Sequence, residues 1–359
     1  MKKYIMSIAF ASLWVPSALG DILTVPAQYP TIAAATAAAG NGDIVVVSPG
    51  TYVENISVFG KDITILAAGS PADTFIDGNV SQDVGELEGF TVLGTLRFAT
   101  DLQVTDCIFD GGGVDVENCV IDFSNTVIRN CTETAVVSFL SGLTFTNCQF
   151  ENNSDGVVRP FDGTATFFGC SFVGNAGGAV RGDNLQFVSC QFVGNTNTSG
   201  PAAIQSTSEF ASCSIDSCDF FSNSSGGLAA AIYIWNDNEG VPVGAISGCA
   251  FENNTAGAGG GAIRLSLLPD PPVMISNTAF CGNSPSDIVG VANLGSGNTF
   301  EAQCDCLADV NGDGSVTPAD FTAWINAFNN NLPECDQNSD GSCTPADFTA
   351  WIANFNIGC

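Results

Sequence analysis

Short apolar runs recur along most of this chain, and each leads into the same phrase. The phrase is Cys, any residue, Phe, any two residues, then Asn; degenerate copies replace Cys by Thr or Phe by Ile. A period of about 20 to 30 residues predicts a solenoid of stacked coils. The full copies are Cys148-Phe150-Asn153, Cys170-Phe172-Asn175, Cys190-Phe192-Asn195, Cys218-Phe220-Asn223 and Cys249-Phe251-Asn254, and the degenerate ones are Cys107-Phe109, Thr126-Ile128 and Thr278-Phe280-Asn283.

Apolar and polar residues alternate within each copy, which predicts short strands with one inward and one outward face. A single copy cannot bury its inward face, but copies stacked about 4.8 Å apart bury one common core. We therefore expect Cys, Phe and a following Val or Ile to form inward files. The Asn should form a ladder of amide hydrogen bonds, and Gly-Gly phrases such as Gly177-Gly178 allow a bend.

The inward Cys file has two interpretations. Buried Cys behaves as a small apolar side chain, so a packing role is favoured over metal ligation or nucleophilic chemistry. The alternative is a set of disulfides between neighbouring coils, which a secreted chain with 15 Cys permits.

An Ala-rich segment near the N-terminus predicts a short helix over residues 31–39, which follow Pro30 and end before Gly40. Such a helix would cover the open end of the stack, as the terminal units of a solenoid must. Residues 43–47 and 62–66 then read as strands, with a turn at Pro49-Gly50.

The C-terminal tail holds two copies of an oxygen-rich loop. Asp or Asn occupies positions 1, 3 and 5, Gly occupies position 6 and Asp occupies position 12. With a backbone carbonyl at position 7, this pattern matches a loop that binds Ca2+. Two complete copies favour two Ca2+ ions over Asp-rich turns without metal. The predicted ligands are Asp309, Asn311, Asp313, Ser315 and Asp320 in the first loop and Asp336, Asn338, Asp340, Ser342 and Asp347 in the second.

Each loop leads into the same predicted helix, whose apolar residues recur at helical spacing on one face. We expect the two apolar faces to pack together. The module buries so little surface that Ca2+ must help to hold it together. The faces consist of Phe321, Trp324, Ile325 and Phe328 in one helix and Phe348, Trp351, Ile352 and Phe355 in the other.

Two segments give the solenoid a family resemblance. Residues 23–66, with the run from Val25 to Ile32 and that from Gly42 to Tyr52, resemble the opening coil of pectin-lyase-like right-handed β-helix proteins. The Phe-x-x-Asn and Gly-Gly-Ala-Ile phrases resemble the repeat of chlamydial polymorphic outer membrane proteins, which are adhesins. The resemblance implies an all-β fold over residues 21–300: a right-handed parallel β-helix solenoid with an N-terminal capping helix.

The duplicated loop and helix resemble a dockerin, and the ending from Phe355 to Cys359 is similar to the tail of GC-type dockerins on surface-anchored bacterial proteins. We therefore expect residues 301–359 to form a small α-helical dockerin-like domain. The residues at loop positions 10 and 11, which contact cohesin in cellulosomal dockerins, are Pro318-Ala319 and Pro345-Ala346 here. This departure favours an anchoring role over cohesin binding of the cellulosomal type.

Five Cys lie in this tail: Cys304, Cys306, Cys335, Cys343 and Cys359. Small secreted modules use disulfides as staples. Because five is odd, one Cys stays free, pairs with the solenoid or serves as an attachment point, for which Cys359 is our candidate.

The composition makes some classes of binding partner unfavourable. Lys and Arg number 8 against 37 Asp and Glu, the net charge is −29, and there is no His. Such a surface repels nucleic acid and anionic lipid, and it disfavours polyuronate substrates. Residues 1–20 read as a signal peptide rather than a membrane anchor, since their apolar run is too short to span a bilayer and Pro16 interrupts it. We expect a secreted protein associated with the cell surface.

One outward column stands out when the coils are aligned on Phe. It contains Arg159, Arg181, Gln205, Tyr233 and Arg264, and Trp235 lies two positions past Tyr233. Arginine and aromatic side chains placed together can hold a sugar or an acidic peptide. The plainer interpretation is a row of ordinary solvated strand residues.

Weak candidates for catalysis are Asp155, Asp162, Arg181 and Asp183, which could meet within two coils. No run of acids matches a known β-helix enzyme motif, so a non-catalytic adhesive or structural protein that binds glycan or protein is favoured. The alternative is a polysaccharide hydrolase or lyase of pectin-lyase-like fold. In either case the tail would dock on an anchoring or cohesin-like partner.

Overall fold

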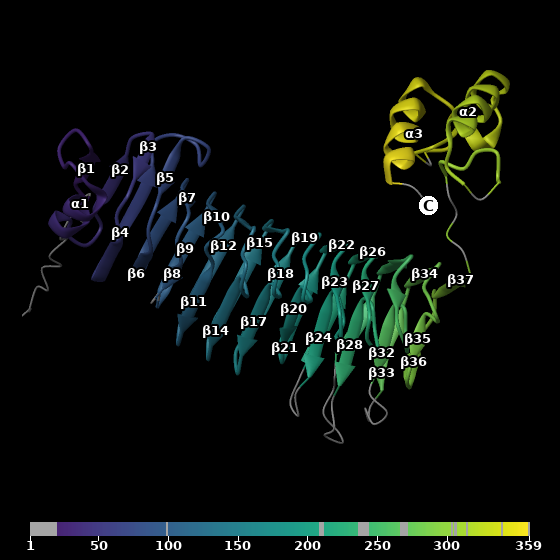
Figure 1. The fold of residues 1–359 in the computed structure, drawn as a ribbon, viewed down its shortest axis with the longest axis horizontal. Coiled ribbons are helices and arrows are strands. Elements are labelled where there is room, and N and C mark those ends of the chain that lie inside the picture. Colours follow the sequence, from purple (N-terminus) through teal and green to yellow (C-terminus); the bar gives the residue numbers. More distant parts are fainter. Residues whose placement is uncertain are drawn as a thin grey trace, which may run out of the picture. The chain divides into compact units, whose positions relative to one another are not determined.

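The computed structural model describes residues 20–97, 100–207, 212–235, 244–265, 272–302, 304, 307–313, 315–338 and 340–357. The predicted signal peptide, except Gly20, lies outside these residues. The chain forms two compact units: one runs up to Ser154 and adds Val158–Thr166, and the other comprises Asp155–Val157 and the residues from Phe167 onward. Figure 1 labels their helices and strands.

In each unit the chain winds in coils of a first, a second and a third strand, and each strand pairs in parallel with its counterpart in the next coil. In the first unit the first strands are the start of β4 (Ile56–Ala67), the start of β6 (Val80–Glu88), β8 (Leu96–Arg97), β11 (Val114–Glu117), β14 (Val136–Phe139) and β17 (Val158–Phe161). The second strands are β1 (Ile22–Val25), β2 (Ile44–Val47), the ends of β4 and β6, β9 (Asp101–Thr105), β12 (Val120–Ser124), β15 (Gly142–Thr146) and β18 (Thr164–Phe168). The third strands are β3 (Gly50–Tyr52), β5 (Thr74–Ile76), β7 (Thr91–Val92), β10 (Ile108–Asp110), β13 (Val127–Arg129) and β16 (Gln149–Glu151).

The second unit repeats this order. Its first strands are β20 (Val180–Gly182), β24 (Ile204–Thr207), β28 (Ile232–Trp235), β32 (Ile263–Leu265) and β35 (Ile288–Val289). Its second strands are β21 (Asn184–Val188), β25 (Ser212–Asp216), β29 (Ala245–Ser247), β33 (Val273–Ser276) and β36 (Ala292–Leu294). Its third strands are β19 (Ser171–Val173), β22 (Gln191–Val193), β26 (Asp219–Phe221), β30 (Ala250–Glu252), β34 (Ala279–Cys281) and β37 (Thr299–Glu301), and the short strands β23 (Thr196–Asn197), β27 (Ser224–Ser225) and β31 (Thr255–Ala256) follow three of them.

The predicted inward Phe file is confirmed within each unit. In the second unit the rings of consecutive third strands stack with centroids 4.6 to 5.1 Å apart and planes within 6° of parallel. The file comprises Phe172, Phe192, Phe220, Phe251, Phe280 and Phe300. In the first unit the same position is held in register by Ile76, Val92, Phe109, Ile128 and Phe150.

The Cys file lies at the corner between the second and third strands, and a packing role is confirmed. These thiols are buried and form no disulfide. Burial raises the pKa of Cys107 to about 12, so this thiol stays neutral. Where Thr126 replaces Cys, its hydroxyl donates to the Ser124 carbonyl, and the thiol of Cys218 likewise reaches the Asp216 carbonyl. The corner therefore accepts any small side chain with a donor. The described Cys at this corner are Cys107, Cys148, Cys170, Cys190, Cys218 and Cys249, while Cys119, Cys131 and Cys213, which also form no disulfide, lie elsewhere in the coils.

The predicted Asn ladder is also present and fully buried at its centre. Asn195 donates from its backbone N–H (3.1 Å) and from Nδ2 (2.9 Å) to Oδ1 of Asn223. Asn223 donates in the same way to Asn254, at 3.1 and 3.0 Å, and its Nδ2 also reaches the Phe192 carbonyl at 2.9 Å. The Asn223 side chain thus satisfies two backbone groups of the preceding coil and donates to the Asn side chain of the following one.

The predicted capping helix is α1 (Ile32–Ala38), which begins after its N-cap Thr31. Two opposite charges of the first full coil bind its two ends. The Glu54 carboxylate accepts from the N–H groups of Ile32 (2.9 Å) and Ala33 (2.8 Å), while Lys61 Nζ donates to the carbonyls of Thr36 (2.9 Å) and Ala37 (2.8 Å). These are the charges that the helix dipole favours at each end.

The tail forms α2 (Pro318–Asn330), the one-turn 3-10 helix η1 (Pro333–Cys335) and α3 (Pro345–Ile357). The helix η1 directly precedes the second loop. As predicted, the helices pack through aromatic rings: Phe321 lies 5.0 Å from Trp351 and Trp324 lies 5.5 Å from Phe348, between centroids.

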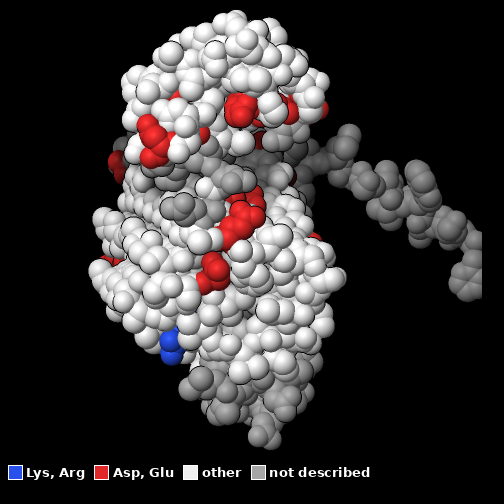
Figure 2. Space-filling view, turned by 90° about the vertical axis from the view of Figure 1, so that its right-hand side faces the viewer, with Lys and Arg blue, Asp and Glu red and all other residues white. Residues whose placement is uncertain are grey.

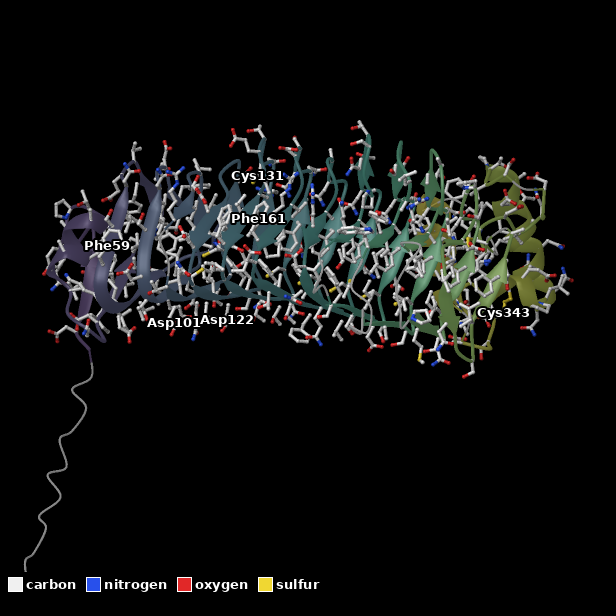
Figure 3. All side chains as sticks on the ribbon, turned by 90° about the horizontal axis from the view of Figure 1, so that it is seen from below. Phe59, Asp101, Asp122, Cys131, Phe161 and Cys343 are labelled. Carbon is white, nitrogen blue, oxygen red and sulfur yellow. A yellow bond between two sulfur atoms is a disulfide. The ribbon has the colours of Figure 1, made fainter. Side chains whose placement is uncertain are left out.

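Two disulfides involve tail residues. Cys304 bonds to Cys281 of β34, so this Cys pairs with the solenoid, and Cys335 bonds to Cys343 (Figure 3). Cys306 and Cys359 lie outside the described residues, so attachment through Cys359 stays a prediction. Within the described residues, no helix has the length and apolar character that crossing a bilayer requires.

Replacing one ladder residue tests how much the stack depends on it. Asn223→Ala should lower the free energy of unfolding by about 2 to 4 kcal/mol, because it leaves donors of Asn195 and the Phe192 carbonyl buried without partners. The exposed Asn293→Ala on β36 serves as the control and should cost less than about 0.5 kcal/mol. Urea unfolding followed by circular dichroism measures both; equal stability of the two variants would contradict the ladder's role.

Candidate functional site

The first loop of the tail gathers its side-chain oxygens around one short turn. The Asp313 N–H donates to Oδ1 of Asp309 (3.0 Å) and of Asn311 (2.9 Å). Oδ1 of Asp313 accepts from the Ser315 N–H at 3.0 Å, and Oδ1 of Asp320 accepts from the Asn311 N–H at 3.2 Å. Loop positions 1, 3, 5 and 12 are thereby brought together.

The second loop repeats this geometry. The Asp340 N–H donates to Oδ1 of Asp336 (3.1 Å) and of Asn338 (3.0 Å), and the Ser342 N–H donates to Asp340 (2.9 Å). Oδ1 of Asp347 accepts from the Asn338 N–H at 3.3 Å. Gly341, at position 6, has φ +83°, a conformation that glycine adopts without strain.

The last acid of each loop is anchored at the start of a helix. Oδ2 of Asp320 accepts from the Thr317 N–H at 2.8 Å, which completes a capping box, and Asp347 accepts from Thr344 at 2.7 Å. Burial would raise the pKa of both carboxyl groups, but these backbone hydrogen bonds outweigh it and hold each pKa below its ordinary value. Both groups are therefore anionic near neutral pH. The donor set consists of hard oxygens, which fits Ca2+.

A second candidate is the outward face of the first strands. In the first unit the register places Arg97 beside Asp115 and places Val137 beside Arg159 of the predicted column. In the next outward column, the rings of Phe139 and Phe161 stack at 4.8 Å with planes 12° apart. These rings are 44% and 45% exposed, so they form a flat aromatic surface open to solvent.

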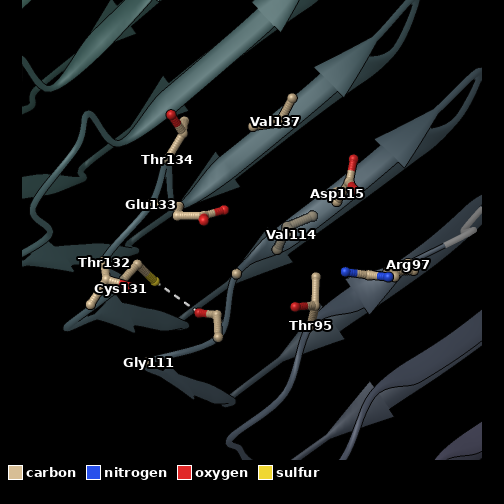
Figure 4. A pocket seen from close by; sticks show the side chains of 12 residues that line it. Thr95, Arg97, Gly111, Val114, Asp115, Cys131, Thr132, Glu133, Thr134 and Val137 are labelled. Carbon is tan, nitrogen blue, oxygen red and sulfur yellow. Dashed lines mark hydrogen bonds between the residues drawn. The ribbon is translucent and has the colours of Figure 1, made fainter.

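A pocket of about 300 Å³ includes the outward residues Arg97, Asp115 and Val137 of three first strands (Figure 4). Exposed Arg97, Asp115 and Glu133 line it, and its floor is bare backbone at Gly112 and Gly113. A Cβ at Gly112 would come 1.9 Å from the Gly94 carbonyl oxygen, so the close stacking of coils requires glycine here. One guanidinium and two carboxylates thus surround a space with a backbone floor.

In the second unit the predicted column is in register: Arg181 pairs with Gln205, Gln205 with Tyr233, and Tyr233 with Arg264. Arg181 is exposed, while Gln205, Tyr233 and Arg264 are half-buried. Trp235, at the end of β28, is 37% exposed. The strip is therefore a continuous outward row on consecutive first strands.

The weak catalytic candidates do not share one strand face. Asp183 follows the end of β20 in a bend, and Asp162 lies in a left-handed turn after β17 with φ +50°. Asp155 and Arg181 belong to the second unit and Asp162 to the first.

Reasoning from the sequence missed Arg97, Asp115, Glu133 and the pairing of Phe139 with Phe161. The outward column of the first strands could have been traced into earlier coils from their inward residues. Leu96 and Val114 are such inward residues, in register with Val80 and Val136. These coils were not recognised from the sequence because their third strands lack the full Cys-x-Phe-x-x-Asn phrase.

Residues 92–256 match the family model of the right handed beta helix region, and residues 307–356 match that of the dockerin type I domain. No curated protein matches the chain. Among solved structures, a pectate lyase is similar at 13% identity and TM-score 0.40, over 79% of this chain and 78% of that one.

Two further structures are similar at the same distant level. The catalytic unit of a thermostable alpha-1,3-glucanase from Streptomyces thermodiastaticus matches at 14% identity and TM-score 0.38, over 76% of this chain and 66% of that one, just under two thirds. The pectin methylesterase from Aspergillus niger matches at 12% identity and TM-score 0.30, over 80% and 87%. None of these likenesses carries an argument about activity. The family models and the parallel coils together identify the chain as a right-handed β-helix with a C-terminal, calcium-binding dockerin type I domain.

Proposed function

We propose that this protein is a secreted, non-catalytic glycan-binding protein whose β-helix presents the binding face and whose dockerin ties it to a surface partner. The observation that carries the proposal is the exposed, stacked pair of Phe139 and Phe161 together with the pocket of Arg97 and Asp115. The flat apolar face of a sugar ring fits an aromatic surface, while its hydroxyl groups match charged side chains at the rim.

The second unit carries a row of its own on its first strands. Arg181, Tyr233 and Arg264 supply donors and an aromatic ring in one row, and Trp235 adds a second exposed aromatic. Successive coils repeat these positions at the strand spacing, so an extended polymer lying across the first strands would meet the same kinds of group again.

The charge of the chain limits which glycan it binds. The net charge is −29, and carboxylates are prominent on the face that Figure 2 shows. A polyuronate would be repelled by this field, so the proposed ligand is a neutral or cationic polysaccharide.

For the tail we propose two bound Ca2+ ions and a protein partner of the cohesin type or another anchoring protein. Pro318-Ala319 and Pro345-Ala346 occupy the loop positions that contact cohesin in cellulosomal dockerins, so the partner surface must differ from the cellulosomal one. Matching apolar side chains, Ile325 on α2 and Ile352 on α3, are each 41% exposed and available to such a partner.

A second candidate function is polysaccharide cleavage. The observation that favours it is the presence of two carboxylates, Asp115 and Glu133, with Arg97 around one pocket. A pair of carboxyl groups can act as acid and base or nucleophile in glycoside hydrolysis. Neither group is held in a buried environment that would set it apart as an acid.

Binding to a panel of insoluble and soluble polysaccharides tests the main proposal. The double variant Phe139→Ala, Phe161→Ala should bind its best ligand roughly tenfold more weakly, because the stacking surface is lost. Phe168→Ala on the second strand β18 removes a comparably exposed Phe from a different face, at 38% exposure, and should bind as the unchanged protein does. Affinity electrophoresis reports both, and equal retardation of the two variants would refute the assignment.

Cleavage assays decide between the two functions. We expect neither reducing sugar nor unsaturated product from the panel. If product does form, its loss in Asp115→Asn or Glu133→Gln would place catalysis in the pocket of the first unit, and its loss in Arg181→Ala or Asp183→Ala would place it in the second. Either result would overturn a purely binding role.

Removal of calcium tests the tail. Chelation by EDTA should shift the emission of Trp324 and Trp351, which are 5% and 6% exposed, to longer wavelength, because the helices separate without the ions. The circular dichroism of the β-helix should persist. Calorimetry should find two Ca2+ ions per chain in the unchanged protein and in the control Asp122→Ala. The variant Asp347→Ala should bind one ion. A single ion in the unchanged protein would contradict the proposal.

A further inference from the structure

A second cavity lies on the outward face of the third strands, away from the first-strand surface. It measures about 610 Å³ and belongs to three consecutive coils of the second unit. A volume of this size holds a small organic ligand. The cavity is lined by Gln191, Val193, Asp219, Phe220, Phe221, Ala250 and Glu252.

The strand register explains this composition. Gln191, Asp219 and Ala250 follow one another in one outward column. Val193, Phe221 and Glu252 occupy the neighbouring outward column. Because Ala250 has only a methyl group, a hollow remains between the carboxylates of Asp219 and Glu252. One column thus presents the amide of Gln191 and the carboxylate of Asp219, and the other presents Val193, the ring of Phe221 and the carboxylate of Glu252.

The two carboxylates carry uncompensated negative charge. Burial raises the pKa of Asp219, and burial together with the charge of Asp219 raises the pKa of Glu252. No Lys or Arg is among the described residues that line this cavity. A cation entering the hollow would therefore be attracted by both groups.

A metal ion fits this cavity poorly. Ca2+ takes six to eight oxygen ligands, whereas the lining offers two carboxylates and one carboxamide next to Val193, Phe221 and Ala250. An organic cation matches both kinds of side chain, since its charge meets the acids and its carbon body meets the apolar side chains. A ring-shaped body covers the face of Phe221 better than a linear stem does, and ammonium groups are attracted to aromatic faces.

We propose that this cavity binds a saccharide unit bearing a free amino group, with the ammonium between Asp219 and Glu252 and the sugar ring against Phe221. The site lies on different strands from the face formed by Phe139 and Phe161, so it can be tested independently of the function proposed above. It would give the protein selectivity for glycans that contain deacetylated hexosamine.

Binding at this site should depend on pH. The ammonium needs ionised carboxylates, so affinity is present above the raised pKa values and is lost as the pH falls through them, earlier than for ordinary Asp and Glu. The outward groups at these columns on the flanking strands β22 and β34 are Gln191, Val193, Ala279 and Cys281. None of them ionises, because Cys281 is disulfide-bonded.

The experiment uses the full chain with calcium and two probes, a glucosamine disaccharide and its N-acetylated counterpart. Calorimetry at low salt should show at least tenfold tighter binding of the free amine. Asp219→Asn with Glu252→Gln should weaken amine binding at least tenfold, and Phe221→Ala should weaken it severalfold. Asp216→Asn with Glu301→Gln makes the same charge change at acids outside the cavity lining and should change affinity less than twofold.

Three outcomes would overturn the proposal. The first is equal binding of the amine and the acetylated disaccharide. The second is amine binding that weakens alike in the cavity variant and its charge-matched control, which would mean general attraction to an acidic protein. The third is binding of a lysine peptide as tight as that of the disaccharide, which would assign the cavity to a protein partner instead. Retained calcium-dependent tryptophan emission and circular dichroism in each variant show that it has folded.

Discussion

Parallel stacking in register is the constraint on which the rest of this structure depends. Adjacent coils lie one strand spacing apart, so each side chain must tolerate a copy of itself directly above and below. Flat rings satisfy this by stacking, as Phe192, Phe220 and Phe251 do, and amides satisfy it by passing hydrogen bonds along the file, as Asn195, Asn223 and Asn254 do. The buried amides also fix the register, because a shift of one residue would leave each of them without a partner. Because the buried residues fix the register, equivalent outward residues of successive coils also lie in rows, and the candidate binding residues lie in these rows.

The repeated phrase made the interior predictable. The Cys, Phe and Asn positions followed from the spacing of the repeat, and the capping helix followed from an Ala-rich run between Pro30 and Gly40. The two oxygen-rich loops followed from their motif, because only a few residue types meet each of its requirements. The outward groups were less predictable, because solvent imposes no such requirement. Asp115 and Glu133 come from different parts of two coils, and Asp219 and Glu252 sit at positions where other coils have Gln, Ala or Val. Cavities form where a small residue such as Ala250 or Gly112 interrupts a column, and a single sequence does not mark those positions.

The two disulfides were also only partly predictable from the sequence. Sequence alone left open whether an odd tail Cys stays free, joins the solenoid or serves for attachment. The structure joins Cys304 to Cys281, an outward residue of β34, and joins Cys335, just before the second loop, to Cys343 within it. The first bond ties the entry of the tail to the β-helix, and the second limits how far the calcium loop can open. Small modules depend on such links because their cores are too small to hold them alone.

We propose that this protein binds its ligand on ordered rows of outward side chains rather than in a deep active site. A crystal structure of the full chain grown with calcium and with a bound oligosaccharide tests this most directly. The account predicts a sugar ring over the paired rings of Phe139 and Phe161 with its hydroxyls toward Arg97 or Asp115, on coils whose Asn and Phe files remain in register. A ligand bound away from both outward faces, or coils in which those two rings do not stack, would contradict it.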